Sequence, residues 1–233
     1  MAFKKTTLKQ IFYILTLTLG FLSCERVAEK TVDNPSGLII SDNSIKLHKL
    51  EKLFVVGDFD GDGKKDTILQ HNYSGLIRTE IIYSPDPDLN DWGDVIYILN
   101  KLEVDVYLAF NKSNQDTLHL GFAQGLYCLI NIGDNNNDGK DEIAFVIDYL
   151  DYSRVNSCLI YSLCNNKWTQ LKEFGVHEAS FDFTTKKAPV FKEIKEYLEK
   201  QKGIWVYMDY PHDEWDNIED IGKMMKLKID KCK

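Results

Sequence analysis

The chain has no excess of positive charge. Its 28 lysine and arginine residues are outnumbered by 36 aspartate and glutamate residues, which gives a formal net charge of −8. Proteins that bind nucleic acid neutralise its phosphates with basic patches. This composition therefore excludes nucleic acid as an expected partner and makes divalent cations the natural charged ligands.

The short motifs of several enzyme classes are also missing. The sequence contains no H-E-x-x-H, G-x-S-x-G, G-x-G-x-x-G or P-loop pattern. The most compact polar and aromatic cluster is residues 212–215, H-D-E-W, and an exposed loop is the simpler interpretation of it than an acid–base or sugar-stacking site. Glu80 and Asp105 are a conceivable glycosidase pair, whose separation the sequence does not give. Motif analysis thus predicts no catalytic residues.

Long apolar runs are scarce, and the one at the start is too short to span a bilayer comfortably. Residues 11–22 follow the positive side chains of Lys4, Lys5 and Lys9, whereas a spanning helix needs about 20 apolar residues. The run ends in G-F-L-S-C, with Cys24 last, which resembles a bacterial lipobox. The alternatives are an ordinary secretory signal and an N-terminal anchor helix.

The lipobox resemblance implies a lipid-anchored protein of the bacterial cell envelope, with the outer membrane preferred to the inner. Residues 1–23 are then a signal peptide, Cys24 carries the acyl chains, and polar residues 24–36 form a tether. Removing residues 1–23 takes away three lysines and no acids, so the net charge changes from −8 to −8 − 3 = −11.

Four further cysteines are present, and their even number permits two disulfides in an exported protein. Cys158 and Cys164 lie six residues apart in one expected strand, too far apart to bridge without a turn between them. The pairing among Cys128, Cys158, Cys164 and Cys232 stays open, and so does the alternative of four free thiols.

Convincing helical periodicity is absent before residue 186, and short β-type runs recur from residue 37 onward, so residues 37–233 are predicted to form an all-β domain. One short C-terminal helix is expected after Pro189, because apolar residues at 191, 194, 197 and 198 have helical spacing. The expected strands are residues 53–56, 67–70, 77–83, 95–99, 104–110, 118–122, 126–132, 143–147, 159–163, 168–174, 204–208 and 225–229.

Two acidic loops match each other position by position, which marks a duplicated unit. Loop one is residues 58–66, D-F-D-G-D-G-K-K-D, and loop two is residues 134–142, D-N-N-N-D-G-K-D-E. Calcium takes six to eight oxygen ligands, and alternate acidic side chains in a curled loop supply them. The expected ligands occupy positions 1, 3, 5, 7 (a backbone carbonyl) and 9 and are Asp58, Asp60, Asp62, Lys64 and Asp66 in loop one, and Asp134, Asn136, Asp138, Lys140 and Glu142 in loop two.

The closing acid decides the type of loop. An EF-hand has its bidentate acid at position 12, where this chain has Leu69 and Phe145. The pattern D-x-[DN]-x-D-G-x-x-[DE] between strands instead resembles the calcium loops of FG-GAP (VCBS-type) repeats. That resemblance covers each loop and the short stretches that flank it. It implies calcium as cofactor and a partial β-propeller or a propeller-like stack of antiparallel sheets.

Four carboxylates in loop one against three in loop two predict tighter calcium binding by loop one. The expected function is a non-enzymatic binding or adhesion module, with an envelope protein or a glycan as partner and structural calcium loops. The alternatives are an envelope hydrolase or glycan-processing enzyme, and a structural lipoprotein.

Overall fold

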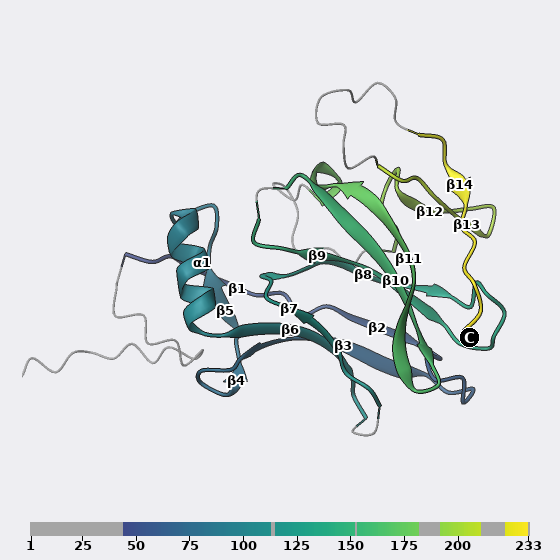
Figure 1. Ribbon diagram of the computed structural model, residues 1–233, viewed down its shortest axis with the longest axis horizontal. Coiled ribbons are helices and arrows are strands. Elements are labelled where there is room, and N and C mark those ends of the chain that lie inside the picture. The colour runs from purple at the N-terminus through teal and green to yellow at the C-terminus, as the bar shows by residue number, and fades with distance from the viewer. Residues whose placement is uncertain (1–43, 113–114, 152, 182–191, 211–221, 233) are drawn as a thin grey trace, which may run out of the picture. The chain divides into compact units, whose positions relative to one another are not determined.

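The described strands of the computed structural model pair in four antiparallel sheets (Figure 1). The structure describes residues 44–112, 115–151, 153–181, 192–210 and 222–232. All of them belong to one compact unit, Asn34–Lys233. The expected signal peptide, Cys24 and the whole of the expected tether, residues 24–36, lie outside the described residues.

The two largest sheets each contain one acidic loop. The first has the order β2-β3-β6-β7, with β4 paired to β3, and the second has the order β11-β10-β9-β8. Their strands are β2 (Phe54–Gly57), β3 (Asp66–Ser74), β4 (Thr79–Glu80), β6 (Val104–Phe110), β7 (Leu118–Gly121), β8 (Gly125–Gly133), β9 (Glu142–Asp148), β10 (Val155–Cys164) and β11 (Lys167–His177).

Two small sheets and two helices complete the described fold. The small sheets are β1 (Leu47–Lys49) with β5 (Tyr83–Pro85), and β12 (Leu198–Gln201), β13 (Ile204–Tyr207) and β14 (Met225–Lys226). The helices are α1 (Trp92–Lys101) and the 3-10 helix η1 (Glu178–Phe181). None of the helices in the described part of the chain is long and apolar enough to cross a membrane.

Strand β9 lies at the centre of the core because both of its faces are buried. Ile143, Phe145 and Ile147 belong to a hydrophobic cluster shared with the first large sheet. Ala144 and Val146 point the other way, into a second cluster shared with the β12–β14 sheet. A strand buried on both faces is apolar throughout and does not alternate, as the sequence I-A-F-V-I shows.

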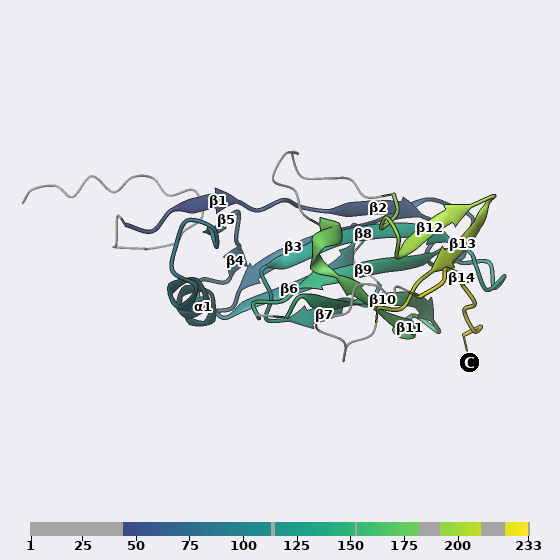
Figure 2. The ribbon, with the colours of Figure 1, turned by 90° about the horizontal axis from the view of Figure 1, so that it is seen from above.

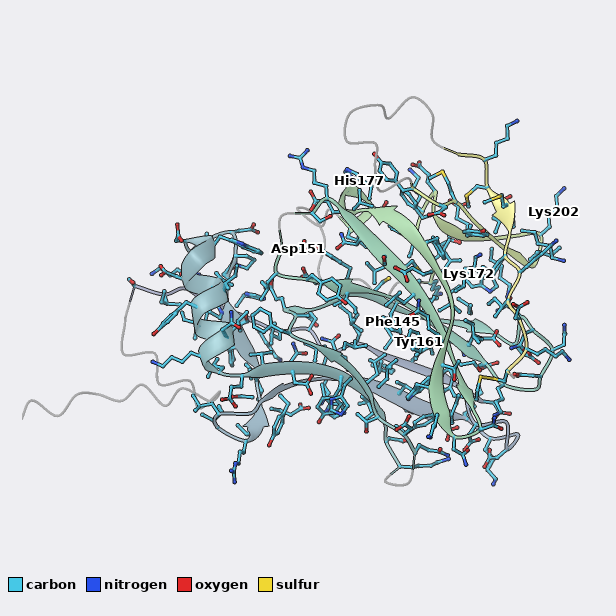
Figure 3. All side chains as sticks on the ribbon, in the orientation of Figure 1. Phe145, Asp151, Tyr161, Lys172, His177 and Lys202 are labelled. Atoms are coloured by element: carbon cyan, nitrogen blue, oxygen red, sulfur yellow. A yellow bond between two sulfur atoms is a disulfide. The ribbon has the colours of Figure 1, made fainter. Side chains whose placement is uncertain are left out.

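Aromatic side chains connect neighbouring strands within this core. Phe145 of β9 and Tyr161 of β10 lie together, with their ring centroids 5.4 Å apart (Figure 3). Lys172 of β11 contacts the β12–β14 sheet, because its ammonium lies 4.3 Å from the ring centroid of Tyr207 in β13. The expected fold, a stack of antiparallel sheets in an all-β domain, is confirmed in the described part of the chain; Figure 2 shows the sheets from above.

One expected strand is a helix. Residues 95–99 lie inside α1, where the Asp91 side chain accepts a hydrogen bond from the Gly93 amide at 2.8 Å and caps the first turn. Val95 and Leu99, four residues apart, are the buried positions of this helix. The run V-I-Y-I-L has the composition of a strand. The Asp91 N-cap and the i, i+4 spacing of Val95 and Leu99 favour a helix instead.

The expected C-terminal helix after Pro189 is wrong for the described residues from 192 onward. Ile194 and Leu198 form a β-bridge, and the chain turns between them, with Glu196 at a φ of 71°, to enter β12. Both side chains are buried in the second cluster. A tight turn buries the same apolar pair that a helical turn would, so spacing alone did not distinguish the two.

Candidate metal sites

Both acidic loops connect the strands of a hairpin in the same register. Gly57 pairs with Asp66 at the end of the β2–β3 hairpin, and Gly133 pairs with Glu142 at the end of the β8–β9 hairpin. In the sequence repeat, Gly57 corresponds to Gly133 and Asp66 corresponds to Glu142. The repeat seen in the sequence is therefore a repeat of a β-hairpin with an acidic loop at its tip.

The two loops also share backbone conformations. Gly63 and Gly139 occupy equivalent positions and have φ values of 78° and 89°, in the left-handed region that glycine tolerates. Gly61 and Asn137 are likewise equivalent, with φ values of 79° and 58°. Asparagine is the residue other than glycine that most readily adopts this conformation, so the second loop keeps the same curl without a second glycine.

Three carboxylates of loop one converge. Asp58, Asp60 and Asp66 each offer one oxygen, and these oxygens lie within 4.8 Å of one another. The loop itself orients Asp58, whose two oxygens accept hydrogen bonds from the amides of Gly61 and Gly63, both at 2.9 Å. The result is a small ring of negative charge at the tip of the hairpin.

Asp62 and Lys64 are the other two residues expected to supply ligands here, through the Asp62 carboxylate and the Lys64 backbone carbonyl. Asp62 is exposed and is not one of the converging carboxylates. Its carboxylate accepts hydrogen bonds from the Lys64 amide at 2.8 Å and from the Lys64 ammonium at 3.3 Å. The Lys64 amide is the main reason that the pKa of Asp62 is lowered.

Lys112, which follows β6, is a component of loop one that the sequence did not indicate. Its ammonium forms a short ion pair with Asp66, and this bond is the main reason that the pKa of Lys112 is raised. Its position arises from the β3–β6 pairing, in which Ile68 lies opposite Phe110. A lysine far away in the sequence thus holds a cation against the triad.

Loop two brings together Asp134, Asp138 and Glu142, again with one oxygen of each within 4.8 Å of the others. Asn136 forms hydrogen bonds to Asp138 within the loop. Its Oδ1 accepts a hydrogen bond from the Asp138 amide at 2.9 Å, and its Nδ2 donates to Asp138 Oδ2 at 3.2 Å. The ammonium of Lys140 donates to the Leu163 carbonyl at 2.7 Å and so ties the loop to β10.

The acid at position 9 is buried in both loops. Asp66 is 1% exposed and Glu142 is fully buried. Among the described residues, Asp66 Oδ2 and Glu142 Oε1 have no hydrogen-bond partner. A buried carboxylate oxygen without a partner carries a desolvation penalty of about 1–3 kcal/mol or more, and a cation at the triad removes it. The donor sets therefore fit a metal ion.

Glu142 has the more strongly perturbed carboxyl group. Burial raises its pKa to about 7, and the charges of Asp134 and Asp138 act in the same direction. The amide and side-chain nitrogens of Asn135 donate to Glu142 Oε2 at 2.8 and 3.3 Å and partly oppose this rise. Without a cation, the Glu142 carboxyl is therefore protonated in part of the molecules near neutral pH.

The two loops are hydrogen-bonded to each other. The Asp141 amide donates to the Asp58 carbonyl at 2.8 Å, and the Asp58 amide donates to Asp141 Oδ2 at 3.1 Å. Asn131 completes the junction by donating to Asp141 Oδ2 at 2.9 Å and to the Val56 carbonyl at 3.0 Å. Asp141 precedes Glu142 directly, so one ligand candidate of each loop adjoins the junction.

Gly57 is required at this junction by close packing. A Cβ at this position would lie 2.3 Å from Asn131 Nδ2 and 2.5 Å from Asp141 Oδ2. Distances this short are not tolerated between non-bonded atoms. The sequence shows Gly57 as part of the repeat, but its role in joining the two loops depends on the tertiary structure.

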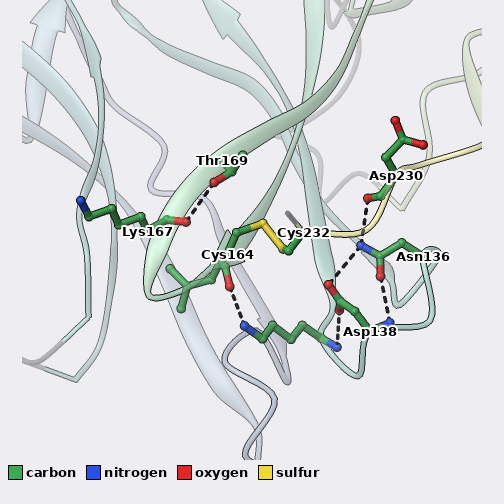
Figure 4. The surroundings of a disulfide bond; sticks show 9 residues. Asn136, Asp138, Cys164, Lys167, Thr169, Asp230 and Cys232 are labelled. Carbon is green, nitrogen blue, oxygen red and sulfur yellow. Dashed lines mark hydrogen bonds between the residues drawn. A yellow bond between two sulfur atoms is a disulfide. The ribbon is translucent and has the colours of Figure 1, made fainter.

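A disulfide attaches the C-terminal segment to the end of β10, and the same segment is hydrogen-bonded to loop two (Figure 4). Cys164, at the end of β10, is bonded to Cys232. Nearby, Asn136 Nδ2 donates to the Asp230 carbonyl at 3.3 Å, and the Lys231 ammonium donates to the Asn137 carbonyl at 2.9 Å. The pairing that the sequence left open is therefore decided by the position of the C-terminal segment beside this loop.

The remaining described cysteines, Cys128 and Cys158, are free and fully buried. Both lie opposite Val146 of β9, one on each side, within the second hydrophobic cluster. Burial raises the pKa of the Cys128 thiol to about 12. These two residues act as small apolar side chains of the core.

The two carboxylates considered for glycoside hydrolysis, Glu80 and Asp105, each form a hydrogen bond with a histidine. Glu80 and Asp105 lie on either side of Tyr73 in the sheet. Glu80 forms a short hydrogen bond with His71 Nδ1, and Asp105 is bonded to His119 Nδ1 at 2.7 Å. The H-D-E-W cluster at residues 212–215 lies outside the described residues.

The comparisons with known proteins give no family. No family model matches the chain, no curated protein matches it, and no solved structure matches it. The class of protein is defined by the structure: its described residues form an all-β stack of antiparallel sheets with two carboxylate triads that can hold metal ions.

Proposed function

We propose that each acidic loop binds one calcium ion, and that the two ions stabilise the hairpins of a lipid-anchored binding module of the bacterial cell envelope. The observation that carries the calcium proposal is the buried acid at position 9, Asp66 or Glu142, which leaves one oxygen without a partner beside two further carboxylates. The same arrangement occurs at both hairpin tips, in the same register.

The donor chemistry favours calcium over other metals. Each triad offers oxygen atoms alone, which hard cations prefer, whereas zinc sites typically contain cysteine or histidine. Magnesium demands a nearly ideal octahedron at short distances, and calcium accepts irregular oxygen cages. The resemblance of the loop pattern to FG-GAP repeats supports the same ion, with Asp62, Asn136 and the carbonyls of Lys64 and Lys140 as further candidate ligands.

The calcium proposal is tested by thermal unfolding in calcium and in a chelator. An ion at a concentration of 100 times its dissociation constant stabilises the native state by about 2.7 kcal/mol per site. For a domain of this size, each kcal/mol raises the midpoint by roughly 2–4 °C, so two sites together should raise it by about 10–20 °C. We expect the double variant Asp66→Asn/Glu142→Gln to show no calcium-dependent rise. An unchanged midpoint of the natural chain in calcium would end the proposal.

The binding-module proposal is supported by the outer face of the β3–β6–β7 sheet. His71, Tyr107 and His119 lie opposite one another across the three strands. The Tyr107 ring centroid is 4.7 Å from that of His71 and 5.5 Å from that of His119. Glu80 and Asp105 are hydrogen-bonded to these histidines, so aromatic rings and charged groups lie together on one face. Aromatic side chains are enriched at protein interfaces, which supports a partner-binding role for this face.

Capture of envelope proteins or glycans on the immobilised chain tests the binding-module proposal. Tyr107→Ala removes the central ring, and we expect it to lower the recovery of the captured partner. Tyr97→Ala is a matched control, because Tyr97 is an exposed tyrosine of α1. Equal recovery with both variants would exclude this face as the partner surface.

The anchor proposal concerns Cys24 and the membrane. Acyl chains on one cysteine contribute about 0.8 kcal/mol for each buried methylene and hold a protein durably at a membrane. We expect metabolic labelling with a fatty acid to mark the natural chain and not a Cys24→Ser variant, which should be released from the membrane fraction. Labelling of the variant would contradict acylation at Cys24.

A further inference from the structure

A hollow lined by lysine side chains lies beside β14, and no residue of either acidic loop lines it. Its volume is about 550 Å³, within the range of about 300–1,000 Å³ that is typical of ligand sites. The residues that line it are Lys172, Tyr207, Met225, Lys226 and Lys228. They include three basic side chains and no acid. We call this hollow the basic groove.

The three lysines of the basic groove are available to an anionic partner. None of them forms an ion pair among the described residues. Lys226 and Lys228 are exposed. The ammonium of Lys172, which Figure 3 labels, is positioned at the groove by its contact with the ring of Tyr207, 4.3 Å away. The groove therefore has a local positive charge on a chain whose formal net charge is −8.

Strand β14 is at the edge of its sheet and pairs with β13 on one side only. The Leu227 amide donates to the Trp205 carbonyl at 2.9 Å. Successive residues of an antiparallel strand direct their backbone groups to alternate sides, so those of Lys226 and Lys228 point away from β13. These backbone groups have no hydrogen bond among the described residues, and they are therefore free to pair with a further strand.

The basic groove follows this free edge. Met225 pairs with Tyr207 across the two strands. Their side chains share the face on which Trp205 and Leu227 are buried in the second hydrophobic cluster. Lys226 is on the opposite face of β14 and nevertheless lines the same hollow. A hollow that is lined from both faces of a strand is located at the edge of that strand.

We propose that the basic groove binds an extended acidic peptide segment of a partner protein, which adds to the free edge of β14 as a further strand. Main-chain hydrogen bonds to Lys226 and Lys228 hold the segment, as in other cases of strand addition. These two lysine side chains lie on one face and pair with acids at alternate positions of the segment, and Lys172 adds a third positive charge. The residue between the acids faces Met225 and Tyr207 and is apolar. The expected pattern is acid–apolar–acid.

Charge decides which strand this edge accepts. Across a pair of strands, opposite charges are stabilising and like charges are destabilising. Lys226 and Lys228 therefore disfavour pairing with β14 of a second copy and favour an acidic strand. Lysines on an edge strand also protect a protein from aggregation, which is the competing explanation for these two residues. The two explanations differ in whether an acidic strand binds.

Three capped peptides test the proposal: G-E-V-E-V-E-G, G-E-E-E-V-V-G and G-K-V-K-V-K-G. Binding to the full chain is measured by titration of backbone amide shifts. We expect the first peptide to bind, with an affinity that falls as salt is added. The second has the same composition without the alternation, and it should bind roughly fivefold more weakly, the factor that two cross-strand pairs produce. The third should not bind.

Two pairs of variants locate the site. Lys226→Gln removes one charge of the groove and should weaken binding of the first peptide roughly threefold. Lys200→Gln is the matched control, because Lys200 lies on β12, the other edge strand of the same sheet, and does not line the groove. It should leave the affinity unchanged. Lys228→Pro removes the outward amide as well as the charge, so it should weaken binding more than Lys228→Gln does.

No binding of the first peptide would overturn the proposal and assign the lysines to protection of the edge. Equal binding of the first two peptides, or equal weakening by Lys226→Gln and Lys200→Gln, would overturn it by showing attraction through charge alone. Residues 211–221, outside the described residues, contain five acids. Binding that appears only after these acids are changed to amides would assign the groove to the chain itself. The calcium and Tyr107 proposals are tested by the melting midpoint and by capture, so failure here leaves them standing.

Discussion

At the scale of single residues, Lys112 and a calcium ion would compete for the same carboxylate. The Lys112 ammonium forms an ion pair with Asp66, and its side chain is half exposed. The sequence predicts tighter binding by loop one from its four carboxylates, but the structure brings three acids together in each loop and adds this lysine to loop one. Lys112 therefore opposes the expected order of affinities.

We expect Lys112→Met to strengthen calcium binding at loop one by roughly threefold, the size of effect that partly exposed ion pairs produce. The measurement is calorimetric titration of a Glu142→Gln background, in which loop two is disabled. Lys64→Met is the control, because the Lys64 ammonium contacts Asp62 outside the triad. A weaker affinity in Lys112→Met would show that this lysine supports the site.

Glu142 gives a pH dependence whose sign depends on calcium. Its pKa is about 7 in the folded metal-free chain, against an ordinary value of 4.5. The folded state thus holds a proton that the unfolded state has released, and the resulting stability is present below pH 4.5 and is lost as the pH rises through 7. The proposed calcium ion would bind the charged carboxylate, so its binding would release this proton and become tighter over the same pH range.

In chelator, we expect the free energy of unfolding to fall between pH 5 and pH 8, with a Glu142 contribution on the order of 2 kcal/mol. Urea unfolding of the natural chain and of Glu142→Gln measures that contribution as the difference between their pH profiles. Asp148 also has a raised pKa, of about 6, so its contribution to the free energy of unfolding also decreases as the pH rises. This contribution is the same in both chains and cancels in the difference. Parallel profiles would contradict the assignment to Glu142.

At the scale of elements, the two hairpins meet through Asp141, and this junction should couple the two calcium sites. The calcium ion proposed for loop two would order the segment around Glu142, which includes the Asp141 side chain that accepts a hydrogen bond from the Asp58 amide. Loop one is then partly ordered before its own ion binds, and positive cooperativity follows when one ligand lowers the ordering cost of the next.

We expect calcium titration of the natural chain to give a Hill coefficient above 1, and Asp141→Ala to bring it to 1. Lys65 occupies the position in loop one that corresponds to Asp141 in loop two, so Lys65→Ala is a matched control that should leave the coefficient unchanged. A coefficient of 1 in the natural chain would show that the loops bind independently despite their contact.

At the scale of the whole molecule, the Cys164–Cys232 disulfide joins cysteines that are 68 residues apart and connects the C-terminal segment to the central sheet. A loop of this length stabilises the native state by about 4 kcal/mol in the chain-entropy model. The closed segment contains the β12–β14 layer, whose side chains share the second hydrophobic cluster with β8–β11. The disulfide therefore holds the β12–β14 sheet against the β8–β11 sheet, in addition to closing the loop between the two cysteines.

We expect the double variant Cys164→Ser/Cys232→Ser to unfold more easily by about 4 kcal/mol and to bind calcium more weakly at loop two, because Asp230 and Lys231 no longer stay beside Asn136 and Asn137. Loop one should keep its affinity. Denaturant unfolding and calcium titration measure the two effects, and treatment of the natural chain with a reductant should reproduce them. An unchanged loop two would limit the disulfide to global stability.

The acidic loops and most strands could be predicted because their signals are local. The Asn165–Asn166 turn is one example: both residues have positive φ, as a two-residue hairpin requires. Strand 104–110 was predicted at the bounds of β6. Helix α1 was missed because its β-branched and aromatic residues favour a strand, whereas its helical signals are one cap and one buried pair.

The sequence by itself determined the all-β class, the duplicated hairpin and the positions of the carboxylates, because alternation, turn residues and acidic spacing act over a few neighbouring residues. Only the tertiary structure decided which acids converge, that Lys112 reaches Asp66, that Asp141 joins the loops and that Cys232 pairs with Cys164. Those contacts join residues far apart in the chain, and they form only when the sheets stack and bury the apolar faces of their strands.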